Sequence, residues 1–160
     1  MRRSDRKMDS RQCNALLDRA FVCRVATADS TGAPYVVPMS FVFEPESGLI
    51  FIHCASSGHL LDNIREDGRV CFEVDEPGEV IATGEYACDT SQVYESVICF
   101  GKARVLDGPE KRRALESLVQ KYVDRLDPGR AYDPELTTID ATVAIAIAVD
   151  TMTGKRRPAL

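Results

Sequence analysis

The sequence lacks the features that mark membrane, secreted and zinc-binding proteins. It contains no apolar run long enough to span a bilayer, and no apolar segment follows the basic N-terminus as it would in a secretion signal. None of the six cysteines forms a C-x-x-C pair, so a structural zinc site is not expected. We therefore predict a cytoplasmic protein with free thiols, no metal site and no membrane contact.

Nucleotide-binding fingerprints and a basic character are also missing. Neither G-x-G-x-x-G nor G-x-x-x-x-G-K-[ST] occurs, which argues against a Rossmann or P-loop fold. Acidic residues outnumber basic ones by 25 to 20, and the resulting net charge of -5 does not favour nucleic acid as the main partner. The basic residues near both ends are predicted to be solvated, with residues 1–8 and 155–160 as flexible tails.

The apolar content is sufficient for one domain over residues 1–160, because 44% of the residues are hydrophobic. Short apolar or alternating runs predict six strands, over residues 21–28, 33–43, 49–52, 69–75, 95–106 and 142–150. Helices are expected after Asp9 or Ser10, before Gly68 and after Asp107. We predict a mainly β (α+β) fold, an antiparallel six-stranded barrel with flanking helices.

Turn-forming residues divide these runs. Glu76-Pro77-Gly78 predicts a turn that ends the fourth strand, and residues 79–89 are a weaker candidate for a strand, with a break at Gly84. Gly101 indicates a bulge or bend in the fifth strand. The connection over residues 127–141 is long and rich in Pro, Asp and Thr, which is typical of a functional or dimer-contacting loop.

Residues 49–65 run from a predicted strand into a predicted helix. Between the two lie small and hydrogen-bonding residues, His53-Cys54-Ala55-Ser56-Ser57-Gly58-His59. The first turn of a helix has unpaired N–H groups and a partial positive charge, so this corner is a candidate site for a phosphate. The alternative is that Ser57 only caps the helix.

Pro38 interrupts the strand predicted over residues 33–43. Proline has no N–H to donate to a neighbouring strand, so the strand is expected to lie at an edge or to bulge at this point. Residues 35–41 are therefore a candidate ligand-facing edge, because their backbone groups would be free to meet something other than a strand. An ordinary edge strand is the alternative.

Several blocks in this order resemble a known family. They are residues 1–6 (MRRSDR), 22–26 (VCRVA), 34–41 (PYVVPMSF), 51–55 (FIHCA) with Gly58-His59, 69–75 (RVCFEVD), 94–103 (YESVICFGKA) and 153–155 (TGK). Together they resemble the 5-nitroimidazole-resistance (Nim) family of the pyridoxamine 5′-phosphate oxidase-like, FMN-binding split barrels. The resemblance covers most of the chain.

This resemblance implies a homodimer with FMN at the subunit interface. The strand that includes residues 37–41 would face the flavin ring, the corner at residues 53–59 would hold the phosphate, and residues 94–97 would contribute from nearby or from the other subunit. The cofactor-binding residues that it implies are Val37, Pro38, Met39, Ser40, Phe41, His53, Ala55, Ser56, Ser57, Gly58, His59, Leu60, Tyr94, Ser96 and Val97.

Position 60 departs from the family pattern. Family members commonly have Lys at the position of Leu60, where the ammonium can pair with the phosphate. Such a charge-assisted hydrogen bond contributes roughly 1.5–3 kcal/mol. Its absence is expected to weaken FMN binding by about one to two orders of magnitude, unless His59, Ser56, Ser57 or Arg65 compensates.

Three functions follow from the resemblance. The first is an NAD(P)H-dependent flavoprotein reductase of small acceptors such as nitroimidazoles, in which His59 donates a proton or polarises the acceptor, or only binds phosphate. The second is a non-catalytic flavin- or haem-binding protein, with His53 or His59 as the haem ligand. Pyridoxamine 5′-phosphate oxidation ranks last, because its substrate needs a second basic pocket and no basic cluster is evident outside the terminal segments.

Overall fold

The structure is a computed structural model, and it describes residues 3–126 and 139–159 apart from the side chains of residues 124–126. In chain order its elements are η1 (Ser4–Arg6), β1 (Lys7–Met8), α1 (Ser10–Arg19), β2 (Val22–Ala28), β3 (Pro34–Glu44), β4 (Leu49–Ala55), α2 (His59–Glu66), β5 (Arg69–Ala82), η2 (Ala87–Asp89), β6 (Thr90–Val105), α3 (Gly108–Leu126) and β7 (Thr142–Arg157). None of the helices in the described ranges is long and apolar enough to cross a membrane.

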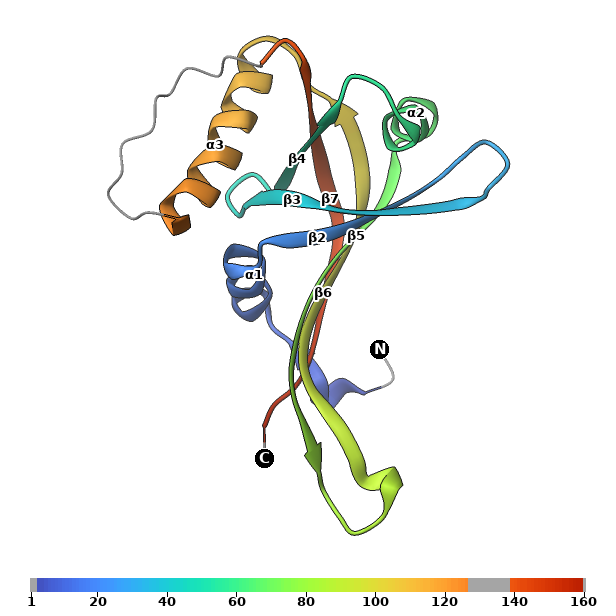
Figure 1. The fold of residues 1–160 in the computed structure, drawn as a ribbon, viewed down its shortest axis with the longest axis vertical. Coiled ribbons are helices and arrows are strands. Elements are labelled where there is room, and N and C mark those ends of the chain that lie inside the picture. Colours follow the sequence, from blue (N-terminus) through green and yellow to red (C-terminus); the bar gives the residue numbers. More distant parts are fainter. Residues whose placement is uncertain (1–2, 127–138, 160) are drawn as a thin grey trace.

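Six strands close into an antiparallel barrel, as the sequence predicts (Figure 1). The order around the barrel is β7-β4-β3-β2-β5-β6, and β6 pairs again with β7 to close the ring. The two-residue strand β1 adds to β7 outside this ring. Figure 1 also shows that β5 and β6 extend below the barrel as a long hairpin.

Successive side chains of each strand point alternately into the barrel and away from it. On β4, Ile50 and Ile52 lie in the main core with Phe41 and Phe72, and each of these four side chains is fully buried. Phe51 points the other way and lies in a second core under α3. Because this part of β4 is covered on both faces, its side chains are apolar on both faces. This explains the continuous hydrophobic run in its sequence.

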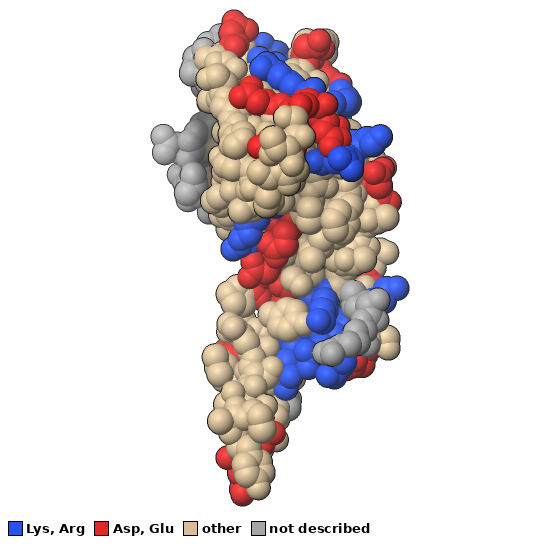
Figure 2. Space-filling model, turned by 90° about the vertical axis from the view of Figure 1, so that its right-hand side faces the viewer, with Lys and Arg blue, Asp and Glu red and all other residues tan. Residues whose placement is uncertain are grey.

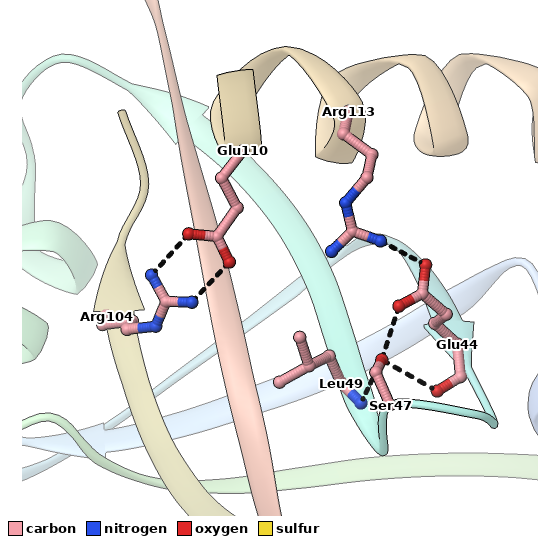
Figure 3. Close-up of polar contacts among 6 residues, drawn as sticks. All are labelled: Glu44, Ser47, Leu49, Arg104, Glu110 and Arg113. Carbon is pink, nitrogen blue, oxygen red and sulfur yellow. Dashed lines mark hydrogen bonds and ion pairs between the residues drawn. The ribbon is translucent and has the colours of Figure 1, made fainter. Parts of the chain in front are cut away.

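Ion pairs fasten α3 to the outside of the barrel (Figure 3). Arg113 of α3 donates to the carboxylate of Glu44 at the end of β3, at 2.6 Å, and Ser47 also donates to this carboxylate. Arg104 of β6 forms a two-bond pair with Glu110 in the first turn of α3. These groups are partly exposed, so solvent screening keeps the contribution of each pair to stability small.

Four strands, β4 to β7, are longer than the sequence predicts. The turn predicted at residues 76–78 is wrong, because β5 continues through it with an irregular register between Pro77 and Val80. The long partner strand β6 supplies hydrogen bonds on the far side of this irregularity, so Pro77-Gly78 bends the strand without ending it. The bulge predicted at Gly101 is confirmed by the register shift between Phe100 and Gly101.

The prediction of flexible tails is wrong for the residues next to the two termini. Lys7 and Met8 form β1, and residues 155–157 form the end of β7, which pairs with β6. Met8 is only 3% exposed and belongs to the main core. The terminal segments are ordered because each supplies backbone hydrogen bonds to the other, and the apolar Met8 is covered.

The N-cap predicted from the sequence is confirmed for α1 but not for α2. Asp9 caps α1 through a reciprocal pair of bonds with Gln12, as predicted. The Ser57 cap is wrong, since Gly58 is the N-cap of α2 and no side chain caps that helix. Of the loop predicted over residues 127–141, residues 127–138 lie outside the described part of the chain.

Two core thiols give the protein a pH-dependent stability. Burial raises the pKa of Cys23 and Cys99 to about 12, from an ordinary value of 9.0. Above pH 9 the unfolded chain loses these protons while the folded chain keeps them, so the free energy of unfolding falls as pH rises towards 12. We expect urea unfolding to show a loss of up to about 2 kcal/mol per thiol between about pH 8 and about pH 10.5.

Two variants distinguish the contribution of the buried thiols from that of other groups that titrate at alkaline pH. A variant with Cys23→Ala and Cys99→Ala should lose less stability over the same pH interval, although cavities make it less stable at the start. Cys88→Ala, which removes an exposed thiol, should behave like the parent protein. Equal losses in all three proteins would contradict the assignment.

Candidate functional site

The strand β3 changes partners in its middle. Residues 34–40 pair with β2, whereas residues 41–44 pair with β4. Beyond Ile52, β4 pairs with β7 and no longer with β3. Within the described ladders, residues 34–40 therefore have a strand on one side only, and Pro38 lies on this open edge, as predicted.

Side chains on the open edge alternate between the core and the outside. Val37, Met39 and Phe41 pack in or against the main core, so their backbone groups are what they offer to a ligand at the edge. Pro38 is exposed and Ser40 half-buried on the opposite face. The residues predicted to face a ligand thus present backbone groups at the edge and, at Pro38 and Ser40, side chains on the outer face.

Tyr122 of α3 binds the backbone of β3 where β3 and β4 separate. Its hydroxyl accepts a hydrogen bond from the N–H of Phe41, at 2.9 Å, and donates to the carbonyl of Phe21. Nothing in the sequence near Tyr122 indicates this role, because the contacts join residues separated by at least 81 positions. Tyr122 anchors α3 beside the open edge.

Replacing Tyr122 with Phe is expected to lower the free energy of unfolding by about 1–3 kcal/mol. The change leaves the partly buried N–H of Phe41 without its partner, and an unsatisfied buried donor carries that penalty. Urea unfolding monitored by circular dichroism measures the difference. Tyr86→Phe, at an exposed tyrosine, is the control and should be neutral; an equally small effect at Tyr122 would contradict the anchoring role.

The corner between β4 and α2 is open to an anion. Ala55, Ser56, Ser57, Gly58 and His59 are all exposed. Gly58 has φ 138°, a conformation that favours glycine, and no side chain bonds to the first N–H groups of α2. The predicted combination of hydroxyls, free helix N–H groups and an imidazole is therefore present at one exposed corner.

His59 connects this corner to the β2–β3 hairpin. Its ring lies 4.7 Å from the ring of Tyr35, at 37°. Hydrogen bonds from the Thr31 hydroxyl and the Ala33 N–H lower the pKa of Asp29, and His59 adds a weaker electrostatic contribution. The start of α2 consequently lies beside the beginning of the open edge.

A buried hydrogen bond fixes α2 on the barrel. The amide of Asn63 donates to the hydroxyl of Thr27 at 2.9 Å, and both residues are buried. Leu60 packs into the main core and is only 7% exposed. Its side chain therefore does not face the corner, and its backbone N–H is the group it can offer there.

The remaining predicted residues lie elsewhere. Tyr94 and Ser96 are half-buried, and Val97 is fully buried in the core, so its side chain cannot reach a ligand. These residues pair with the end of β7, in the lower half of Figure 1, whereas α2 lies at the top. One chain does not bring them to the α2 corner, and their contribution from a second subunit stays a prediction.

His53 faces a different space from His59. It lines a cavity of about 270 Å³ between α3 and the point where β3 and β4 separate. The other lining residues are Ser40, Leu115, Leu118, Val119, Tyr122, Ile139 and Thr142. Pockets that enclose a ligand are usually about 300–1,000 Å³, so this cavity alone does not enclose a flavin or a haem.

The outer face of the sheet carries an exposed apolar row. Val36, Ala26, Cys71 and Phe100 are successive cross-strand partners on β3, β2, β5 and β6. Val36 is 61% and Phe100 55% exposed. No local pattern signals this row, because it depends on the register of four strands; it lies on the same face as Pro38.

The comparisons with known proteins agree with this geometry. A sequence model of the pyridoxamine 5′-phosphate oxidase family matches residues 9–156. No curated protein sequence matched the chain.

Solved structures match over nearly the whole chain. One is a Bacteroides thetaiotaomicron protein provisionally described as a 5-nitroimidazole antibiotic resistance protein, with 26% identity, a TM-score of 0.77, and coverage of 94% of this chain and 86% of that one. The FAD and heme binding protein of Mycobacterium smegmatis has 24% identity, a TM-score of 0.79, and coverage of 96% and 74%. The flavocytochrome Anf3 of Azotobacter vinelandii has 21% identity, a TM-score of 0.76, and coverage of 94% and 68%.

Proposed function

The chain belongs to the pyridoxamine 5′-phosphate oxidase family, and from this premise we propose that it is a flavoprotein that binds FMN at the interface of a homodimer. Flavin is named for two of the similar structures, the FAD and heme binding protein and the flavocytochrome. The observation that carries the proposal is the open edge of β3 beside the uncapped start of α2.

The residues of this site fit the two ends of FMN. Backbone groups along residues 34–40 are available to the polar edge of a flat ring system, and the N–H groups at the start of α2 are available to a phosphate. Ser56 and Ser57 are exposed at the same corner and offer hydroxyl donors. Leu60 does not add a charge, so the phosphate end depends on neutral donors and on cations from elsewhere.

A second copy of the chain would complete the site. The open edge of β3 and the start of α2 are exposed in one chain, and the apolar row from Val36 to Phe100 would be covered by a partner. Tyr94 and Ser96, which lie far from the α2 corner of their own chain, would then reach the flavin of the other subunit.

We propose that the bound flavin serves an NAD(P)H-dependent reductase of small acceptors such as nitroimidazoles. FMN supplies the hydride and electron transfer, while the protein positions it and excludes water. In this proposal His59, beside Tyr35 at the corner, would hold a proton or the phosphate. The test is steady-state oxidation of NADH or NADPH by the FMN-loaded protein with a nitroimidazole; absence of turnover would overturn the reductase proposal.

A haem-binding protein is the second candidate, and the position of His53 favours it. His53 lines a mostly apolar cavity, whereas the ring of His59 lies against that of Tyr35 in a tilted arrangement. If the protein binds haem, titration with haemin should give a Soret band that is lost in His53→Ala and retained in His59→Ala. Absence of the band would exclude this candidate.

The phosphate end of the site can be tested separately from the ring. Gly58→Ala forces a side chain onto a backbone with φ 138°, which costs about 1–3 kcal/mol or displaces the start of α2. We expect FMN affinity to fall about tenfold, with little change for riboflavin, which lacks the phosphate. Gly48→Ala, which also has positive φ but lies at the β3–β4 turn, is the matched control for strain.

A further inference from the structure

Basic residues from both ends of the chain meet at one place. Lys7 of β1 lies directly opposite Lys155 of β7 in the antiparallel ladder. Arg157 lies one pleat further along β7, opposite Tyr94 of β6. Figure 2 shows Lys and Arg side chains gathered in the lower half of the molecule. The solvated and separate ends predicted from the sequence are therefore one cationic surface.

These cations share one face of the sheet. Directly opposite residues of an antiparallel pair point to the same side, and so do residues two apart on a strand. Lys7, Lys155 and Arg157 are thus on the same face as Tyr94 and Ser96, their neighbours on β6. Ile98 continues this face along β6 towards the exposed apolar row.

Most of the nearby carboxylates are bound by other arginines, and Asp9 accepts a hydrogen bond from the N–H of Gln12. Asp5 pairs with Arg3, and Asp75 pairs with Arg24. Arg19 binds both Glu76 and Glu95. None of the ion pairs formed within residues 3–126 and 139–159 includes Lys7, Lys155 or Arg157. Like charges directly opposite each other destabilise a sheet, so this arrangement opposes folding unless an anion neutralises it.

We infer that Lys7, Lys155 and Arg157 form an anion-binding site for a phosphate group on the outer face of the sheet. Lys and Arg donate charge-assisted hydrogen bonds to phosphate oxygens, and the hydroxyls of Ser96 and Tyr94 lie on the same face. The phosphate has two chemical sources that the site would accept alike. One is the FMN held at the α2 corner of a partner subunit, which rests on the proposed function; the other is a dissociable nicotinamide dinucleotide.

The first test uses inorganic pyrophosphate on the protein without flavin. At about ten times its dissociation constant, pyrophosphate should raise the melting temperature by about 3–6 °C over sodium chloride of equal ionic strength. A variant with Lys155→Gln and Arg157→Gln should lose most of this shift. In buffer without multivalent anions the same variant should melt at or slightly above the parent, because the repulsion with Lys7 is relieved.

The matched control removes two exposed cations elsewhere, by Lys102→Gln and Arg112→Gln, and should keep the full shift. A shift that survives in the Lys155→Gln, Arg157→Gln variant would overturn the inference. Because pyrophosphate binding needs no flavin, this failure is distinct from a failure to bind FMN.

Two further arms identify the source of the phosphate. If the site holds the flavin phosphate of a partner, the Lys155→Gln, Arg157→Gln variant should lose at least tenfold in affinity for FMN and little for riboflavin. If it holds a nicotinamide dinucleotide, the same variant should lose affinity for that dinucleotide in equilibrium binding, with FMN affinity unchanged. Unchanged affinities for both would contradict a role with either ligand.

Discussion

Replacing Phe100 with Asp is expected to separate the proposed homodimer into monomers and to weaken FMN binding at least about a hundredfold. Phe100 is 55% exposed in one chain and lies in the apolar row with Cys71, Ala26 and Val36. Burying an unpaired carboxylate in an interface costs several kcal/mol, and a two-fold dimer would bury it twice. Light scattering after size exclusion gives the mass, and flavin fluorescence gives the affinity.

The control for this prediction is Val105→Asp. Val105 is also an exposed apolar residue of β6, but it lies at the end of the strand next to α3. This variant should remain dimeric and keep its FMN affinity. If Phe100→Asp is dimeric and binds FMN as the parent does, the outer face is not the interface and the flavin site does not depend on it.

Phe72→Ala is expected to lower the free energy of unfolding by about 3–5 kcal/mol. Phe72 is fully buried, and its ring lies 5.0 Å from that of Phe41 in an edge-to-face arrangement at 71°. Domains of this kind are stable by about 5–15 kcal/mol, so this one change removes about a fifth or more of the typical stability. Urea unfolding at neutral pH measures it.

Phe21→Ala serves as the comparison, because Phe21 is 43% exposed. A half-exposed ring loses less burial, so we expect this variant to be destabilised by about 1 kcal/mol. Equal losses at the two positions would contradict the placement of Phe72 at the centre of the barrel core.

Local sequence signals predicted the parts of the fold that depend on neighbouring residues. Asp9, one of the two predicted caps, caps α1, and its partner Gln12 lies within one helical turn. Pro38 indicated an open edge, since a missing N–H restricts any strand pairing. The bulge at Gly101 was predicted because glycine inside a strand often marks a bulge. A Cβ at this position would lie 2.1 Å from the carbonyl oxygen of Ala148, so the close approach of β7 requires glycine.

Features that depend on pairing between distant segments were not predictable in this way. The pairing of Lys7 with Lys155 joins the two ends of the chain, so each end alone suggested a solvated tail. Pro77-Gly78 is a strong turn signal, yet the long β6 partner keeps the strand continuous. The apolar row through Phe100 requires the register of four strands, which no single segment contains.

The sequence predicted the exposure of the corner between β4 and α2, but it did not predict where every candidate side chain points. The corner at Ser56, Ser57 and Gly58 is exposed as expected, whereas the side chain of Leu60 packs into the core. The spacing of Leu60, Leu61 and Ile64 indicates the buried face of α2, and it is the family resemblance that places Leu60 among the cofactor-binding residues. The sequence also did not show that His53 and His59 face different spaces. His53 lines the cavity beside α3, whereas His59 lies against Tyr35.

The absorption spectrum of the protein after addition of excess FMN and desalting tests the flavin site most directly. The proposed site predicts that the protein retains a two-banded flavin spectrum and elutes as a dimer that carries FMN in equimolar amount. A colourless protein after this treatment would contradict the flavin site at the open edge of β3 and the start of α2.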